Sequence, residues 1–330
     1  MPYLFVFQNL IKSSLENSMK NVVLLLLLLS HTIFAYADFS GCMDQFYAGN
    51  TPQINNAALK KNLYPLCFNG FAVAYSGVSR TPLWSAEHLT PQRLKQAKSI
   101  SRENNFHEED QIPARYRSRL SDYSRSGYDR GHMAPNGDMA NRAQQFDSFS
   151  LANMVPQSPK NNQEVWRNLE EATRTLVTRH KQSAYVVTGP AFLSGELKQV
   201  GQVLVPTHVF KAVYFPQLNL AGAYFAPNDQ SGQVDVVSIK ELEQTLGINI
   251  FPSMSAPLKA KRTLLPLNSN QASKANQSWG TGTTKVKPAV GAQSNGSGDH
   301  ASKAEHSNAD WIAQIKHQLV ELLVGFLRSR

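Results

Sequence analysis

The sequence predicts a mixed α+β fold, and three observations support this prediction. Short runs of β-branched and aromatic residues predict strands, amphipathic runs at 3.6-residue spacing predict helices, and the two kinds do not alternate regularly as they do in βαβ proteins. Of the 330 residues, 42% are apolar and 17% are charged, which is ordinary for a globular protein. The chain is therefore long and apolar enough for one large domain or two small ones.

Five segments have the composition of strands. Each is a short run that contains β-branched or aromatic residues, and Gly189-Pro190 forms a turn that ends the second of them. The predicted strands are residues 71–75, 185–188, 202–205, 208–215 and 221–225.

Two segments have the pattern of helices. Residues 162–180 place apolar side chains at helical spacing, including Val165, Leu169 and Leu176. A second helix is expected to begin after Ser238, a capping residue that is followed three positions later by Glu241.

The N-terminal segment has the three-part layout of a secretory signal peptide. Lys20 precedes the apolar run of residues 22–29, and Ala35-Tyr36-Ala37 has the small-x-small pattern of a cleavage site. We expect residues 1–37 to be removed and the protein to be secreted or periplasmic. The alternative is a membrane anchor, but the run is well short of the ~20 residues that span a bilayer. Because Met19 would itself suit a signal peptide, residues 1–18 are interpreted as an upstream extension.

The two cysteines, Cys42 and Cys67, form no CxxC pair, which excludes a cysteine-based zinc finger. Export would place both in an oxidising compartment, so we predict a disulfide between them. Two free buried thiols are the alternative.

The composition narrows the function classes further. The sequence contains no GxxxxGK, GxGxxG or GxSxG motif, which argues against P-loop motors, Rossmann dehydrogenases and α/β-hydrolases. The net charge of +9 suits a polyanionic partner such as nucleic acid, or an anionic membrane.

The C-terminal part differs in composition from the expected working domain, residues 38–267. Residues 268–309 are rich in small and polar residues and predict a flexible linker. Residues 310–330 have the pattern of an amphipathic helix. This helix could lie on a membrane surface, pair with another copy, or dock on the domain, and the sequence does not choose among these.

The segment Asp129-Arg130-Gly131-His132 contains the residue types of a candidate catalytic site, although an arginine two residues before a histidine is also common by chance. In a strand, residues two apart share a face, so Arg130 and His132 can converge on one ligand. A neutral histidine can take a proton from water, and an arginine can hold a phosphate through two parallel hydrogen bonds. The glycine between them allows a tight backbone path.

The same segment resembles the DRGH signature of the DNA/RNA non-specific endonucleases, a family that includes secreted bacterial nucleases and mitochondrial endonuclease G. The similarity extends over about residues 42–255 in several ordered motifs. They are an R-x-x-x-F stretch within residues 102–110, an N-x-x-P-Q segment at 153–157, an N-Q-x-x-W-x-x-L-E helix at 162–170, and the segments 187–190, 205–211 and 241–252.

The resemblance implies a ββα-metal (His-Me finger) fold with a central, mainly antiparallel sheet flanked by helices. It implies that His132 is the general base, that Asn162 is the sole direct protein ligand of Mg²⁺ (Mn²⁺ or another divalent cation being alternatives), and that Glu170 holds metal-bound water. Arg130 and Arg102 would stabilise the transition state. The expected reaction is hydrolysis of DNA and RNA to 5′-phosphate products, by an enzyme that is often a homodimer in this family.

Each assignment near the metal has a structural alternative. His132 could be a hydrogen-bonded structural histidine, Asn162 could be a helix N-cap, and Glu170 could be a solvated helix residue. The adjacent Asn161 also leaves the register of the motif open by one residue, although Gln163 and Trp166 favour Asn162. On a continuous α-helix, Asn162 and Glu170 would be separated by roughly 12 Å of rise and about 80° of rotation, which suits a water-mediated role for Glu170.

The other positions also leave alternatives open. Arg93 or Arg115 could replace Arg102, because the Arg102 segment matches the family pattern more loosely. Asp129 is expected to be a structural hydrogen-bond acceptor, and His208 is expected to serve packing. The runner-up function is a non-catalytic nucleic-acid-binding protein on a nuclease scaffold. The presence of all the expected site residues argues against it.

Overall fold

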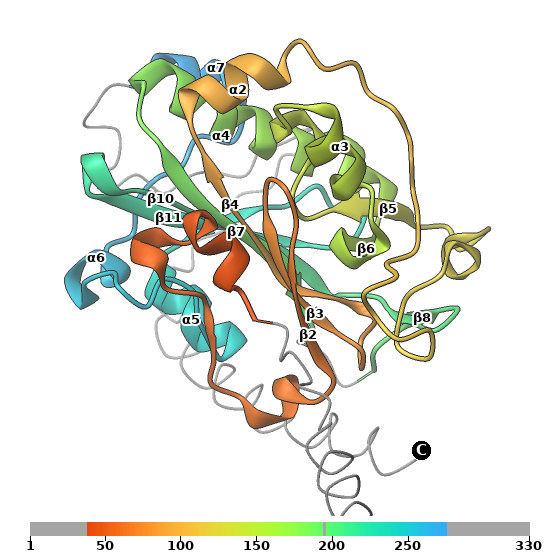
Figure 1. The fold of residues 1–330 in the computed structure, drawn as a ribbon. Helices are drawn as coiled ribbons and strands as arrows, with labels where there is room; N and C mark the ends of the chain where they lie inside the picture. The colour runs from red at the N-terminus through yellow and green to blue at the C-terminus, as the bar shows by residue number, and fades with distance from the viewer. Residues whose placement is uncertain (1–37, 194–195, 276–330) are drawn as a thin grey trace, which may run out of the picture. The chain divides into compact units, whose positions relative to one another are not determined.

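A seven-stranded antiparallel sheet forms the centre of the protein in a computed structural model, which describes residues 38–193 and 196–275 (Figure 1). The strand order is β12-β11-β10-β7-β4-β3-β2, and every neighbouring pair is antiparallel. The strands are β2 (Leu63–Cys67), β3 (Ala72–Ser76), β4 (Thr81–Leu89), β7 (Ala184–Ala191), β10 (His208–Phe215), β11 (Leu220–Pro227) and β12 (Asp235–Val237).

Three smaller strand pairs and a set of short helices surround this sheet. The pairs are β1 (Gln53–Ile54) with β13 (Ile248–Asn249), β5 (Asp129–His132) with β6 (Met154–Gln157), and β8 (Gln199–Val200) with β9 (Val203–Leu204). The α-helices are α2 (Pro91–Ala97), α3 (Arg142–Ser148), α4 (Arg167–His180), α5 (Ile239–Leu246), α6 (Ala256–Ala260) and α7 (Ser269–Lys274). The 3₁₀ helices are η1 (Ser40–Gln45), η2 (Tyr47–Gly49), η3 (Ala57–Lys60), η4 (Leu120–Tyr123), η5 (Asn136–Asp138), η6 (Leu151–Asn153) and η8 (Pro216–Leu218), and η7 (Asn161–Trp166) is π-helical.

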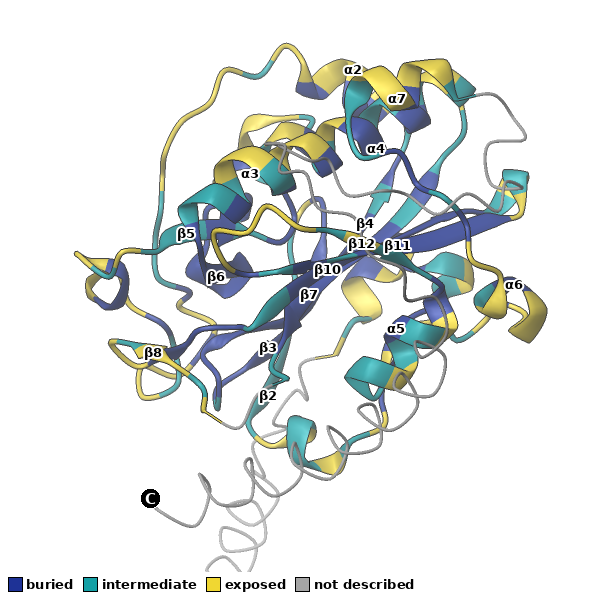
Figure 2. Cartoon of the chain, turned by 180° about the vertical axis from the view of Figure 1, so that it is seen from behind, coloured by how far each residue is buried: buried dark blue, intermediate teal, exposed yellow. Residues whose placement is uncertain are grey.

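The central sheet buries both faces. Adjacent residues of a strand point to opposite faces, so Ala212 and Val213 of β10 belong to different hydrophobic clusters. Ala212 packs in the cluster that contains residues of α5 and α6, and Val213 packs in the cluster that contains residues of α2, α4 and α7. Figure 1 shows these two groups of helices on opposite sides of the sheet. The strands between them are dark in Figure 2 because they are buried.

These features confirm the predicted α+β class and the central antiparallel sheet flanked by helices. Four of the five predicted strands are present as β3, β7, β10 and β11, whereas residues 202–205 contribute only the two-residue strand β9. The turn predicted at Gly189-Pro190 is wrong, because β7 continues through both residues and pairs them with β10. The predicted capping box is also present: the Ser238 amide donates to Glu241 Oε2 at 2.8 Å, and the Glu241 amide donates to Ser238 Oγ at 3.2 Å.

The helix predicted at residues 162–180 begins differently from the prediction. Asn161–Trp166 is π-helical, and the regular α-helix α4 starts only at Arg167. The π-helical segment buries two residues five positions apart, Asn161 and Trp166, which would point about 140° apart on an α-helix. The rotation expected between Asn162 and Glu170 on a continuous α-helix is therefore wrong. Such segments are rare and often lie at functional sites.

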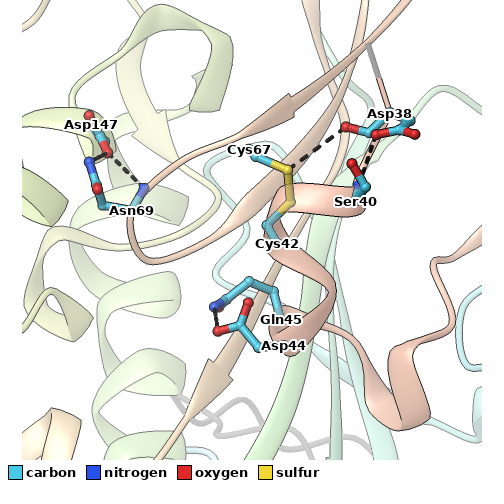
Figure 3. The surroundings of a disulfide bond; sticks show 8 residues. All are labelled: Asp38, Ser40, Cys42, Asp44, Gln45, Cys67, Asn69 and Asp147. Atoms are coloured by element: carbon cyan, nitrogen blue, oxygen red, sulfur yellow. Dashed lines mark hydrogen bonds between the residues drawn. A yellow bond between two sulfur atoms is a disulfide. The ribbon is translucent and has the colours of Figure 1, made fainter. Parts of the chain in front are cut away.

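The predicted disulfide is present and joins η1 to the end of β2 (Figure 3). The Cα atoms of Cys42 and Cys67 are 5.6 Å apart. Beside the bond, Asp147 accepts hydrogen bonds from the amide and the side chain of Asn69 at 2.9 and 2.7 Å, which ties the β2–β3 turn to the end of α3.

The ordered domain extends past the expected boundary at residue 267. Residues 269–274 form α7, which is capped by Asn268, and Ala272 is fully buried beside α4. Arg179 of α4 also donates a hydrogen bond to the Ala275 carbonyl. The predicted signal peptide, the rest of the linker and the helix predicted at 310–330 lie outside the described residues. Among the described residues, no helix is long and apolar enough to cross a membrane.

Candidate active site

Two strands and a helix hold the predicted site residues. Strands β5 and β6 pair antiparallel, with Arg130 opposite Pro156 and His132 opposite Met154, and the chain then enters η7 and α4. This β-β-α order is the ββα arrangement that the resemblance predicted. Arg130 and His132 lie two residues apart in β5 and therefore on one face of it.

The glycine between them is needed for a reason that differs from the prediction. Gly131 does not have a positive φ angle, but the Gln157 side chain from β6 fills the space beside its Cα. A Cβ at position 131 would lie 2.6 Å from Gln157 Cβ, closer than non-bonded carbon atoms approach. Gln157 in turn donates to Asn161 Oδ1 at 2.6 Å, which links the strand pair to the start of the helix.

Two phenylalanine rings contact three of the predicted site side chains, those of His132, Arg130 and Arg102. The Phe106 and Phe149 rings meet edge to face, with their centroids 4.8 Å apart. The His132 ring contacts both, at centroid distances of 5.8 and 4.9 Å. The Arg130 guanidinium lies over Phe106 at 4.0 Å, and the Arg102 guanidinium lies over Phe149 at 5.2 Å. Cation–π contacts of this kind hold a guanidinium in place without using its hydrogen-bond donors.

The donors of Arg130 are consequently available for a ligand. Among residues 38–193 and 196–275, no side chain or carbonyl forms a hydrogen bond or an ion pair with Arg130, and Arg102 donates only to Asn104 Oδ1. Arg93 is different, because its buried guanidinium donates to three backbone carbonyls and to Glu87. Arg115 lies over Tyr116 instead. Arg102 is thus the arginine that the fold places beside His132.

The imidazole of His132 is held neutral. Its Nε2 atom is buried and has no hydrogen-bond partner among the described residues, so the contacts of a hydrogen-bonded structural histidine are not found at this atom. Burial and the positive charges of Arg102 and Arg130 lower the pKa of His132 to about 3. A neutral imidazole can accept a proton.

Asn162, rather than its neighbour Asn161, faces the site. Asn161 is buried, and its side chain accepts a hydrogen bond from Gln157 and donates one to the Pro227 carbonyl. Asn162 donates to Asp129 Oδ2 at 2.9 Å, an arrangement that leaves the amide oxygen free for a ligand. Asn162 is not a helix N-cap, because its backbone N–H already donates to the Ser158 carbonyl at 2.8 Å, as in the interior of a helix. Asp129 accepts hydrogen bonds from the side-chain amides of Asn162 and Gln163, in agreement with its predicted role as an acceptor.

Glu170 lies in the first turn of α4 and is only partly accessible to solvent. Burial raises the pKa of Glu170 to about 7, against the opposing effects of Lys211 and Arg174. Glu170 is therefore not the solvated surface residue of the alternative interpretation.

Lys211 is a buried cation on the sheet face that carries α4. Its Nζ donates to Thr188 Oγ1 at 2.8 Å and lies 5.8 Å from the centre of the Trp166 ring. Lys211, Thr188 and Ser85 are directly opposite one another on β10, β7 and β4, so they form one row across the sheet.

A cleft of about 540 Å³ opens beside the strand pair. Its walls combine arginines, aromatic rings and the Asn162 amide. The lining residues are Arg102, Phe106, Leu120, Tyr123, Ser124, Arg125, Tyr128, Asp129, Arg130 and Asn162.

A second cleft, of about 810 Å³, lies beside the disulfide and has the opposite character. We call it the acidic cleft. It is lined by the carboxylates Asp44, Glu108, Glu109, Asp110 and Asp147, and also by His107 and Phe146, whose rings stack 4.3 Å apart.

The sequence matches a family model, DNA/RNA non-specific endonuclease, over residues 49–256. This chain belongs to the DNA/RNA non-specific endonuclease family. It is a DNA/RNA endonuclease, and its ββα site lies within the matched region.

Named relatives of this endonuclease come from fungi, animals and bacteria. Nuclease C1 of Cunninghamella echinulata var. echinulata is 34% identical over 208 residues, covering 56% of this chain and 81% of that protein. Mitochondrial endonuclease G of Homo sapiens is 35% identical over 210 residues (56% and 69%), and a nuclease of Nostoc sp. is 33% identical over 235 residues (64% and 84%). The crystal structure of the EndoG/EndoGI complex matches with a TM-score of 0.54 at 27% identity, over 60% of this chain and 91% of that chain.

Sequence reasoning about this endonuclease missed several residues that organise the site. Asn153 is fully buried, and its side chain bonds to Ser85 Oγ, to both the amide and the carbonyl of Ala134, and to the Ser148 carbonyl. Phe106 and Lys211 lie in segments that resemble the family, but nothing in the sequence indicated their roles. Phe149 carried no signal at all.

Proposed function

We propose that this endonuclease is an exported, metal-dependent enzyme that hydrolyses DNA and RNA with little sequence specificity and leaves 5′-phosphates. One observation supports this most strongly: the imidazole of His132, whose Nε2 has no partner among the described residues, packs against two aromatic rings that each carry a guanidinium. That arrangement presents a proton acceptor beside donors suited to a phosphate. The apolar segment ahead of Asp38 supports export, although the named relatives include mitochondrial nucleases.

The residues present suit a hard divalent cation with few protein ligands. The described residues contain no group of three or more His, Cys, Asp or Glu side chains that could hold a metal ion. The free amide oxygen of Asn162 is an oxygen ligand of the kind that Mg²⁺ accepts while it keeps most of its water shell. In our proposal Asn162 is the direct protein ligand, and Glu170 acts through water. The bound cation would neutralise negative charge on the phosphate and on the leaving oxygen.

The protein groups then perform the hydrolysis. Arg102 and Arg130 bind the non-bridging oxygens of the scissile phosphate and stabilise their charge in the transition state. His132 removes a proton from water, the water oxygen bonds to phosphorus, and the bond from phosphorus to the 3′ oxygen breaks. The 3′ oxygen leaves with the bonding electron pair and takes a proton from solvent water, and His132 releases its proton to solvent. The products are a 5′-phosphate and a 3′-hydroxyl.

Substrate binding also makes His132 a better base. In the free protein burial, and then the charges of the two arginines, lower the pKa of His132 to about 3, where an imidazole binds protons weakly. A phosphate bound by the guanidiniums offsets their positive charge, so that part of the shift is removed and the pKa of His132 rises in the complex. A base is most effective when its pKa lies near the working pH.

The test is cleavage of plasmid DNA and of RNA by the full chain with its disulfide formed. Each substrate is incubated with Mg²⁺ and with EDTA, beside the variant His132→Ala. We expect cleavage of both substrates that requires the metal and is lost in the variant. Binding without cleavage across several divalent metals would refute the mechanism, and full-rate cleavage by His132→Ala would refute the assignment of the base.

A further inference from the structure

The cleft beside the active site has more lining residues than the reaction uses. Arg102, Arg130 and Asn162 form the part of the lining that the mechanism uses. Another part comes from one segment, residues 120–128, which comprises η4 and the turn that leads into β5, and we call this part the outer end. The mechanism uses none of these outer residues. The volume of about 540 Å³ lies within the range of roughly 300–1,000 Å³ that is typical of ligand sites.

The outer end combines a cation with apolar and aromatic surface. Arg125 is exposed and forms no hydrogen bond or ion pair with any described residue. Tyr128 is half-buried, Leu120 is 40% exposed, and Tyr123 is buried with a hydroxyl that lacks a partner within the described part of the chain. A guanidinium beside flat apolar surface is the combination that binds a phosphate and the face of a base together.

The backbone of this segment is held in an uncommon conformation. Arg125 has a φ angle of +55°, which residues other than glycine and asparagine rarely adopt, and Gly127 follows at +78°. Non-glycine residues persist in this region only where the surrounding structure holds them there, and they are concentrated at binding and catalytic sites. The turn places Arg125 and Tyr128 on the wall of the same cleft.

We propose that the outer end of the cleft is a subsite for the nucleotide that adjoins the scissile phosphate. Arg125 binds the phosphate of that nucleotide, and Tyr128, with Leu120, contacts the face of its base. Contact with the face of a base tolerates every sequence, because all bases present a flat π surface. This inference rests on the proposed function, since the subsite is defined by its distance from the reacting phosphate.

The experiment measures binding without cleavage. The full-length wild type is titrated in EDTA with two tetranucleotide strands of equal charge, tetrathymidylate and its abasic counterpart. We expect wild type to bind the strand with bases roughly five- to a hundred-fold more tightly. Tyr128→Ala removes this preference and leaves the affinity for the abasic strand unchanged, whereas Tyr128→Phe retains the preference, because the ring rather than the hydroxyl makes the contact.

A second pair of variants tests the phosphate contact. Arg125→Gly keeps the left-handed turn and removes the guanidinium, so it lowers the affinity for both strands by the same factor. It also reduces the magnitude of the slope of log affinity against log salt concentration by about 0.7. The control is Arg262→Ala, which removes the same charge beside α5 from a side chain that is 61% exposed. We expect it to leave both affinities and the slope as in wild type.

The inference is overturned if wild type binds both strands equally, if Tyr128→Ala keeps the preference, or if Arg125→Gly behaves like Arg262→Ala. The same preparation is assayed for Mg²⁺-dependent cleavage of plasmid DNA. Cleavage combined with any of these results refutes the subsite alone, whereas the absence of cleavage refutes the proposed function itself.

Discussion

The two clefts of this endonuclease differ in charge although one loop contributes to both. This loop, residues 102–111, contributes Arg102 and Phe106 to the cleft beside β5 and residues 107–111 to the acidic cleft beside the disulfide. Three arginines line the first cleft and five carboxylates line the second. A polyanion is attracted to the first and repelled by the second, so the charge of the lining restricts a nucleic acid to one side of the loop.

The larger of these two clefts is not the one beside the proposed reaction site. The acidic cleft is the larger of the two, yet it lies beside the disulfide and the Asn69–Asp147 contacts that hold the chain together. The smaller cleft contains the unpaired arginine donors and lies beside the unpartnered imidazole nitrogen. We therefore expect changes in the arginine-lined cleft to affect activity, and changes beside the acidic cleft to affect stability.

The largest expected effect comes from replacing one histidine by alanine in each of the two regions. His132→Ala should lower kcat by about a thousand-fold, because it removes the proposed proton acceptor. The matched control is His107→Ala, which removes a ring that stacks on Phe146 in the acidic cleft. Its kcat should stay within about two-fold of wild type. Steady-state cleavage at saturating Mg²⁺ measures both, and equal losses in the two variants would remove the distinction between the clefts.

The disulfide should affect stability and leave the chemistry unchanged. Replacing Cys42 and Cys67 together by alanine should lower the free energy of unfolding by about 3 kcal/mol, since the bond closes a loop of 25 residues. Urea unfolding followed by tryptophan fluorescence measures the loss. Activity per folded molecule should match wild type, and a fall in kcat of more than about ten-fold would show that this region supports the reaction.

Charge should matter in one cleft only. Arg130→Ala should lower kcat/KM by about a hundred-fold, because the lost guanidinium stabilises charge on the phosphate. Glu108→Gln removes a charge from the acidic cleft and should change kcat/KM by less than about two-fold at physiological salt, where distant charges are screened. A comparable loss in Glu108→Gln would show that the acidic cleft also contacts substrate.

The smallest expected effect concerns Glu87, a carboxyl on the same face of β4 as Ser85. Burial and the charge of Asp138 raise the pKa of Glu87, despite its ion pair with Arg93 at 3.3 Å. The folded chain therefore keeps this proton after the unfolded chain has released it, so stability falls as pH rises above about 4.5.

The variant Glu87→Gln has no carboxyl proton to release. Its free energy of unfolding, relative to that of wild type, should therefore rise by about 2 kcal/mol from pH 5 to pH 6.5. Urea unfolding at the two pH values measures the difference. Glu108→Gln, which changes a half-buried carboxyl of the acidic cleft, provides the control and should show no such trend. A gain of similar size in the control would mean that general charge repulsion, and not the burial of Glu87, is responsible.

Local patterns predicted the parts of the fold that depend on short segments. The run at residues 208–215 is strand β10, and Ser238 with Glu241 forms the capping box, because both patterns act within a few residues. The π-helical start at Asn161 was not predictable in this way. It accompanies the burial of Asn161, whose side chain donates to the carbonyl of Pro227, 66 residues away along the chain.

The sequence by itself determined the α+β class, the family, the disulfide pair, and the candidate site residues in the segment from Asp129 to His132. These follow from spacing along the chain and from motif order. Only the tertiary structure decided that Asn162 rather than Asn161 faces the cleft, that Arg102 rather than Arg93 lies beside His132, and that two phenylalanines hold the site together. The reason is physical: burial and charge at each of these positions are set by side chains that approach from other elements, and no local pattern records which ones they are.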